Sequence, residues 1–167
     1  ILIVSYFSNF PSGMLKIGNE YKYVTDIFRR VYTKAPTVNY SEIETVTIPD
    51  GYTIEQVSDL YYSSPEYHWV IAIVNNFVDI REEWPKASSD LVEYCKLKYG
   101  GLEGIYQVHH YETPDGLIVQ SDYSGEKIEV TNMQYEELLN DAKREVKILQ
   151  PKYLAYFVSK FKTLISR

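Results

Sequence analysis

The sequence predicts an α+β fold, because short strand patterns and short helix patterns follow one another along a chain of 167 residues. Apolar and polar residues alternate from Glu44 to Ile48, as they do in a half-buried strand. Helix signals occupy residues 53–75. A Thr113-Pro-Asp-Gly turn between two apolar segments predicts a β-hairpin. The length suits one domain of ordinary size, or one core with appendages.

We expect the chain to divide into four segments. The first is an extended N-terminal arm with a strand at residues 1–10, and its residues 23–32 fit either a strand or a short helix. The second is a compact central module, the third a helix followed by a β-hairpin or meander, and the fourth a pair of C-terminal helices. Their predicted bounds are 1–43, 44–85, 86–133 and 134–167. Because the chain opens on Ile1 and not Met, we expect its natural start to lie upstream.

Two helices are expected in the central module. Thr53 and Gln56 have the spacing of a capping box, so the first helix should begin directly after Thr53. Ser64 is a suitable N-cap for the second helix, and Pro65 fits its first position. The second helix is apolar around most of its circumference, so it should be surrounded by protein. We expect the core of the module to contain Ile54, Val57, Leu60, Trp69, Val70, Ile73 and Val74.

The C-terminal segment carries two apolar stripes with helical spacing. The first stripe runs from Tyr135 to Leu149 and predicts one continuous helix, which Gln150-Pro151 ends. Helices of this length are marginal alone in water, so their apolar faces need a partner on the same chain or on another. We expect the central module to fold without residues 134–167. The candidate partner-binding residues are Tyr135, Leu139, Val146, Leu154, Phe157 and Phe161.

Composition excludes several classes of function. The formal net charge of −6 disfavours nucleic-acid binding, which needs a basic surface. Every apolar run is far shorter than the ~20 residues of a membrane span. The single cysteine, Cys95, cannot form an internal disulfide. Seventeen tyrosines are unusual for this length and favour an interaction protein, since tyrosine is enriched at interfaces.

No constellation of residues predicts catalysis, a cofactor, a metal or a small-molecule substrate. His109 and His110 are neighbours in a predicted strand, so they should point to opposite faces and cannot share one metal ion. His68 has no nucleophile at a recognisable spacing and is better explained by packing. Glu82 and Glu83 could suggest a glycosidase acid pair, but that chemistry needs carboxyls placed across a cleft. The sequence therefore predicts a non-enzymatic protein.

Three motifs in order resemble a LysM module, a small βααβ domain. They are Ile48-Pro-Asp-Gly-Tyr-Thr-Ile, Val57-Ser-Asp-Leu-Tyr-Tyr and Ile71-Ala-Ile-Val-Asn-Asn. Thr25-Asp-Ile-Phe-Arg-Arg upstream and Trp84-Pro85 downstream extend the similarity. With the segment from Asn140 to Pro151, residues from about 23 to the C-terminus resemble the LysM-like baseplate wedge subunit of contractile-tailed, T-even type bacteriophages.

The resemblance implies a structural role in the virion. Such a subunit is assembled in the host cytoplasm and joins baseplate wedges to one another and to the central hub region. Its implied partners are scaffold-type wedge proteins and neighbouring wedge or hub proteins, and no catalysis is implied. The LysM-like part would then serve as a protein-binding element.

The chain departs from a LysM module where the closing strand should follow the second helix. Phe77–Ile80 is short, so that strand is either abbreviated or supplied by another segment. This departure puts sugar binding in doubt. Two alternatives stay open: a LysM-type peptidoglycan-binding module and, less favoured, a cell-wall hydrolase. The glycan groove of the first alternative would be formed by Asp50, Gly51, Tyr52, Asn75 and Asn76.

Overall fold

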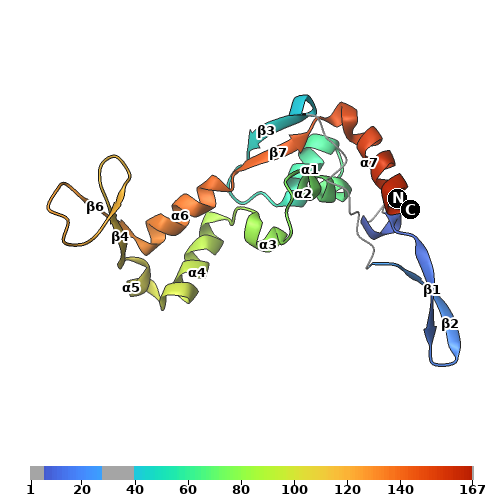
Figure 1. Cartoon of the computed structure of the whole chain (residues 1–167), viewed down its shortest axis with the longest axis horizontal. Coiled ribbons are helices and arrows are strands. Elements are labelled where there is room, and N and C mark those ends of the chain that lie inside the picture. Colours follow the sequence, from blue (N-terminus) through green and yellow to red (C-terminus); the bar gives the residue numbers. More distant parts are fainter. Residues whose placement is uncertain (1–5, 28–39, 167) are drawn as a thin grey trace. The chain divides into compact units, whose positions relative to one another are not determined.

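A computed structural model of the chain describes residues 6–27 and 40–166 (Figure 1). It contains helices and strands throughout, which confirms the α+β class. The chain forms two compact units. Unit 1 is made from Ile1–Val46, Thr53–Arg81 and Val146–Arg167, and unit 2 from Thr47–Tyr52 and Glu82–Glu145. The predicted strand at residues 1–10 is wrong for Tyr6–Asn9, which is a 3-10 helix (η1), while residues 1–5 lie outside the described part.

After η1, unit 1 continues with a β-hairpin of β1 (Ser12–Ile17) and β2 (Glu20–Thr25). Part of the predicted segment 23–32 is therefore strand, and its residues 28–32 lie outside the described part. The remaining elements follow in chain order. Three of them, β3, α3 and β7, have one or two end residues that belong to unit 2. The full set is η2 (Tyr40–Glu42), β3 (Ile43–Thr47), α1 (Ile54–Tyr62), η3 (Pro65–Tyr67), α2 (His68–Val74), α3 (Ile80–Glu83), β7 (Glu145–Leu149) and α7 (Pro151–Ile165).

Local sequence signals set the ends of the helices in unit 1. Thr53 and Gln56 form the predicted capping box: each side chain bonds the backbone N–H of the other residue. Ser64 caps η3, with Pro65 in its first position. The turn after α2 places Asn76 at φ 58°, a left-handed conformation that asparagine tolerates better than most residues.

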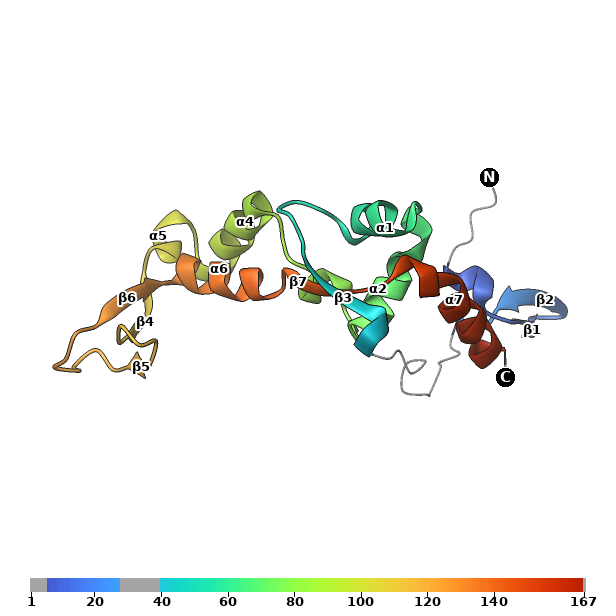
Figure 2. The ribbon, with the colours of Figure 1, turned by 90° about the horizontal axis from the view of Figure 1, so that it is seen from above.

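Strand β7 corrects the prediction of one continuous helix from Tyr135 to Leu149. Helix α6 (Asn132–Ala142) ends first, and Glu145–Leu149 pairs with β3. The flanking backbone bonds, Gln150 N–H to Glu42 O and Ile48 N–H to Arg144 O, show that the two strands run antiparallel. Figures 1 and 2 show β3 and β7 side by side. The spacing of Val146 and Leu149 fits a helix as well as a strand, and the pairing with β3 selects the strand.

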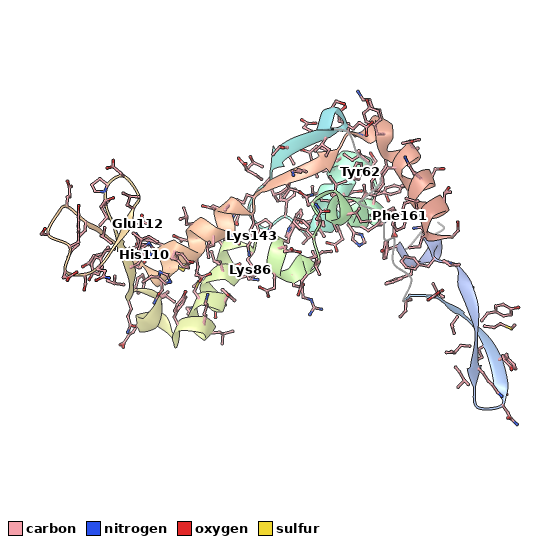
Figure 3. All side chains as sticks on the ribbon, in the orientation of Figure 1. Tyr62, Lys86, His110, Glu112, Lys143 and Phe161 are labelled. Carbon is pink, nitrogen blue, oxygen red and sulfur yellow. The ribbon has the colours of Figure 1, made fainter. Side chains whose placement is uncertain are left out.

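The core of unit 1 forms around Trp69, which is only 5% exposed. Its ring lies 4.8 Å from that of Phe161 and 5.6 Å from that of Tyr6, measured between centroids. Tyr62 donates a hydrogen bond to the carbonyl of Leu149 at 3.0 Å, which ties α1 to the end of β7. Tyr62 and Phe161 are labelled in Figure 3. The aromatic first turn of α2 is therefore packing, as predicted.

Two groups of predictions about burial can now be compared with the structure. Of the expected core, Ile54, Val57, Trp69, Val70 and Val74 are buried, and Ile73 is half-buried. The prediction for Leu60 is wrong. Its side chain is 66% exposed, because residues 54, 57, 58 and 62 form the buried side of α1. The expectation that Val146, Phe157 and Phe161 face a partner is also wrong, since all three are buried in this chain's own core. The C-terminal helix thus packs on its own unit.

Unit 2 packs three helices beside a three-stranded sheet. The helices are α4 (Ser88–Tyr99), α5 (Leu102–Ile105) and α6, and the strands are β4 (Val108–Glu112), β5 (Ile118–Val119) and β6 (Ile128–Thr131). The predicted hairpin is present as β4 and β5, which pair antiparallel. The extension to a meander is wrong, because β6 pairs with β4 and not with β5, which gives the sheet order β5-β4-β6. Leu91, Cys95 and Ile105 form a small buried cluster. Gly100 ends α4 at φ 81°, a left-handed conformation that suits glycine.

Candidate interaction surfaces

The residues that the structure describes contain no group suited to metal chemistry. Across 6–27 and 40–166, no three His, Cys, Asp or Glu side chains gather where they could hold an ion. The same residues include no helix with the length and apolar character to cross a bilayer. Burial raises the pKa of the Cys95 thiol, which keeps it protonated and a poor nucleophile.

His109 and His110 overturn the expectation that they point to opposite faces. A register shift in β4 between Val108 and His110 breaks the strict alternation of the strand. The two Nδ1 atoms lie 2.9 Å apart, so one imidazole donates a hydrogen bond to the other. His110 Nε2 lies 2.7 Å from Glu112 Oε1 (Figure 3). A bulge of this kind has no signal in the sequence that we could have used.

Tyr135 is a predicted partner-binding residue that lies on α6 under this histidine pair. Its ring stacks on His109 with 3.9 Å between centroids and 12° between planes. The side chain is half-buried, so one ring face is used within unit 2. Leu139, one turn along α6, is exposed and remains available to a partner. The other imidazole singled out in the sequence, His68, only bonds Pro65 O through Nδ1 at 3.0 Å.

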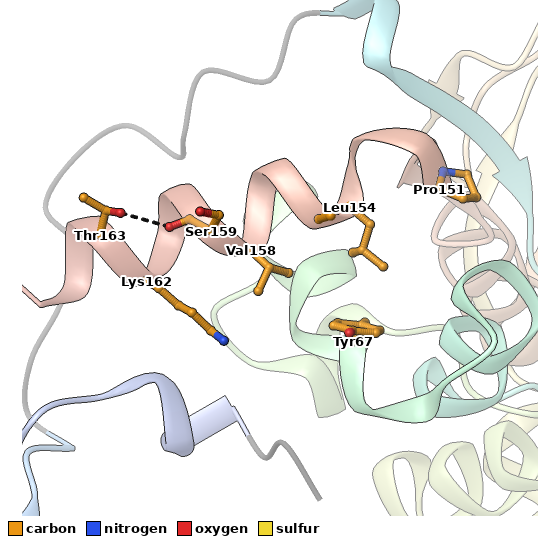
Figure 4. A pocket seen from close by; sticks show the side chains of 8 residues that line it. Tyr67, Pro151, Leu154, Val158, Ser159, Lys162 and Thr163 are labelled. Carbon is orange, nitrogen blue, oxygen red and sulfur yellow. Dashed lines mark hydrogen bonds between the residues drawn. The ribbon is translucent and has the colours of Figure 1, made fainter. Parts of the chain in front are cut away.

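A groove of about 630 Å³ runs along α7 in unit 1 (Figure 4). Leu154, another predicted partner-binding residue, lies half-buried in its wall. The ring of Tyr67 forms the opposite wall, and Lys162 lies toward the end of the groove that is away from Pro151. The full lining is Tyr67, Pro151, Leu154, Ala155, Val158, Ser159, Lys162 and Thr163. Pro151–Ile165 contains three lysines and no acidic residue, so α7 is a basic helix in an acidic chain, and one of its lysines, Lys162, lines the groove.

Two residues of the alternative glycan groove, Asn75 and Asp50, make hydrogen bonds within the chain. The amide of Asn75 donates to Lys147 O at 2.7 Å and accepts from Lys147 N–H at 2.9 Å, so it extends the pairing of β7. Asp50 Oδ1 accepts from Arg144 at 2.8 Å and from Ser88 N–H at 3.0 Å. The hydrogen bond from Arg144 is the main cause that lowers the pKa of Asp50. These hydrogen bonds give Asn75 and Asp50 a structural role within the fold.

Unit 2 contains a buried carboxylate at the edge of a 220 Å³ pocket. Glu136 Oε1 accepts hydrogen bonds from Lys98 Nζ and from the Tyr99 hydroxyl, both at 2.7 Å. Burial would raise the pKa of Glu136, but these two donors outweigh it and hold the pKa below its usual range. The bond to Glu136 in turn raises the pKa of Lys98. The cluster joins α4 to α6 and is a structural device.

We expect Glu136→Gln to destabilise unit 2 by about 2 kcal/mol at pH 7, because it removes a charged partner from two hydrogen bonds. Lys98 is partly solvated, which limits the loss. A carboxyl with a lowered folded-state pKa stabilises the fold above its unfolded pKa of ~4.3, and this contribution is lost as pH falls through the folded pKa. The stability of the wild type should therefore fall below about pH 4 more steeply than that of the variant.

Urea unfolding of unit 2, followed at several pH values through the fluorescence of Trp84 in chains that also carry Trp69→Phe, measures this effect. Glu137→Gln is the matched control, because Glu137 is the exposed neighbour of Glu136 on the same helix. Equal losses for the two variants would show that the ion pair contributes nothing specific.

The hairpin β1–β2 carries an exposed apolar surface that our sequence prediction missed. Every residue of both strands is exposed. A usable signal was present, since Gly18-Asn19 between two alternating segments is typical of a two-residue hairpin turn. Gly18 has the positive φ of 64° that such a turn requires. Six apolar side chains stand on the hairpin: Met14, Leu15, Ile17, Tyr21, Tyr23 and Val24.

Comparison with known proteins gives one family. Residues 13–121, nearly two thirds of the chain, match the family described as base plate wedge protein 53. A search of curated proteins finds no match. The matched range includes the exposed hairpin, helices α1 to α5 and most of the sheet of unit 2. Because this match covers more than half of the sequence, the chain belongs to the base plate wedge protein 53 family.

Proposed function

We propose that this chain is a structural subunit that joins the wedges of a contractile-tail baseplate to one another and to the central hub region. Family membership gives a structural role in a phage baseplate, and the joining contacts are our proposal. The observation that supports it best is the amount of apolar surface left uncovered. Tyr23, for example, is 78% exposed and Tyr21 is 65% exposed. Apolar surface of this extent is typical of protein-binding sites.

We further propose that β3, α1, α2 and β7 form an interrupted LysM-like module. The order strand, helix, helix, strand agrees with such a module, and the antiparallel pairing of β3 and β7 supports it. The closing strand comes from Glu145–Leu149 and not from residues directly after α2. The intervening residues build most of unit 2. The module would thus carry an inserted unit between its second helix and its second strand.

The proposed partners are scaffold-type wedge proteins and neighbouring wedge or hub proteins, met during assembly in the host cytoplasm. Co-expression of the chain with the other wedge proteins of the same phage tests this. We expect the chain to sediment with the assembled wedge, and wedges made without it to fail to join into complete baseplates. Complete baseplates of normal size formed without this chain would overturn the proposal.

The peptidoglycan alternative has a separate and simple test. Asn75 and Asp50 are both engaged in bonds within the chain, so we expect no retention on insoluble peptidoglycan above that of an unrelated acidic protein. A known LysM protein serves as the positive control. Saturable retention that is lost on Tyr52→Ala would favour glycan binding instead.

A further inference from the structure

The hairpin β1–β2 is fixed at its base and exposed along its length. At the base, Asp26 N–H donates to Pro11 O at 2.9 Å, and Phe10 is buried. Tyr6 links this base to the core of unit 1 through its ring contacts with Phe10 and Trp69. Beyond the base, all twelve strand residues are exposed. The hairpin is therefore an exposed arm whose base is fixed to the core of unit 1.

The register of the arm gives it two apolar faces. Residues paired across the strands share a face, so Met14 and Tyr23 lie on one side with Tyr21. Leu15, Ile17 and Val24 lie on the other side by the same pairing. From their exposed fractions, the six side chains present on the order of 700 Å², close to the ~800 Å² that one partner contributes to a standard interface.

Such an arm needs a partner that covers both faces. An isolated two-stranded hairpin is marginally stable in water, and apolar residues on both sides add the cost of their hydration. A second copy of the chain could pair with it edge to edge and make a four-stranded sheet. That pairing would satisfy edge N–H and C=O groups but leave Tyr23 and Leu15 exposed on opposite faces. A cleft with two apolar walls covers both.

The charges on the arm indicate what should line the mouth of that cleft. Glu20 is its only acidic residue, and it lies 4.0 Å from Lys22. Lys16 lies over the ring of Tyr21 at 5.9 Å and makes no ion pair among the residues that the structure describes. The arm thus has an excess of one positive charge at its exposed end, and carboxylates on a partner would complement it.

We propose that the β1–β2 hairpin is a docking arm that inserts, with both faces buried, into an apolar cleft rimmed by carboxylates on a different baseplate wedge protein. The proposal rests on the baseplate role proposed above and assigns one of its contacts to a defined element. It differs from edge-to-edge pairing because it requires Met14, Tyr21 and Tyr23 on one face and Leu15, Ile17 and Val24 on the other to be covered together.

Amide hydrogen exchange of residues 12–25 is the first test, with the full chain alone and in wedges reconstituted with the other wedge proteins of the same phage. Free, the arm should exchange close to the rate of an unstructured peptide, because it has no cover. In the wedge, its exchange should slow at least about tenfold. Unchanged exchange on assembly would overturn the proposal.

Paired variants test whether both faces are used. Tyr21→Ser/Tyr23→Ser removes the apolar groups of one face, and Leu15→Ser/Ile17→Ser those of the other. Leu97→Ser/Leu102→Ser in unit 2 is the matched control, since both leucines are exposed outside the arm. Each arm variant should reduce incorporation into wedges at least about tenfold, while the control incorporates like the wild type. Loss from only one face would contradict insertion into a cleft.

Site-directed cross-linking identifies the partner even if a variant weakens the hairpin itself. Tyr23→Cys and Leu15→Cys place a benzophenone label on opposite faces, and buried Cys95 should not compete for the reagent. Both labels should attach to one other wedge protein. A product of twice the mass of this chain would overturn the proposal in favour of a second copy. If the unlabelled wild-type chain enters no wedge at all, the proposed function fails, and not this contact alone.

Discussion

Replacing Trp69 with alanine is expected to lower the free energy of unfolding of unit 1 by about 3–5 kcal/mol. Trp69 lies at the meeting point of three segments: its ring contacts Tyr6 from the N-terminal part and Phe157 and Phe161 from α7. Removing it leaves a cavity that α7 can fill only by shifting, and the aromatic contacts add to the lost apolar burial. Domains of this size are stable by only about 5–15 kcal/mol, so much of that margin would disappear.

Urea unfolding followed by far-ultraviolet circular dichroism gives the change in free energy for this variant. The chain has two tryptophans, so Trp84 in unit 2 is the only one left in Trp69→Ala, and the fluorescence of this variant reports on unit 2. We expect the Trp84 transition to move much less than the overall one. Leu60→Ala is the control on α1, because Leu60 is exposed, and it should change stability by less than about 0.5 kcal/mol. A loss below about 1 kcal/mol for Trp69→Ala would show that unit 1 does not depend on this contact.

Local signals in the sequence identified those parts of the fold that local chemistry determines. The Thr53–Gln56 capping box and the helix start at Ser64 and Pro65 depend on residues a few positions apart. The helix around Trp69 was predicted to be surrounded because its apolar residues leave no polar face. In each case the structure is stabilised by hydrogen bonds within the segment, or by burial of apolar side chains that does not depend on a particular partner.

Parts selected by distant contacts were not predictable in the same way. The segment from Glu145 to Leu149 has apolar residues that suit either a helix or a strand, and its partner β3 lies about a hundred residues earlier. No local sequence signal near β7 indicates that β3 is its partner. The same limit applies to Phe157 and Phe161, whose stripe showed that they needed cover but not which surface supplies it.

The predictions about the candidate site show the same difference between local signals and distant contacts. Sequence reasoning placed the partner surface on the C-terminal helices, and of those residues Leu154, Tyr135 and Leu139 keep some exposure. It missed the hairpin, whose exposure depends on the absence of a covering element among the described residues and not on its own composition. The bulge that turns His109 toward His110 was missed because a one-residue register shift follows from pairing with β6.

Deleting Pro151–Arg167 is expected to abolish cooperative folding of unit 1, although the sequence alone suggested that the central module folds without its C-terminal segment. The deletion exposes the aromatic core, because Phe157, Phe161 and Ile165 are its buried contribution from α7. Burying a phenylalanine in a core is worth about 3–5 kcal/mol, so two of them approach the whole stability of a domain. Unit 2 contains no residue of α7 and should keep its own unfolding transition.

Point variants separate this effect from a general cost of truncation. Phe157→Ala/Phe161→Ala should reproduce the loss of the unit 1 transition, by more than about 5 kcal/mol in total. Tyr156→Ala, on the exposed side of the same helix, should change it by less than about 0.5 kcal/mol. If the truncated chain unfolds at the wild-type urea concentration, α7 is an appendage and the buried aromatic contacts contribute little. In that case its apolar face would again be free to bind a neighbouring subunit, and loss of wedge assembly by a folded truncation would be the result that establishes it.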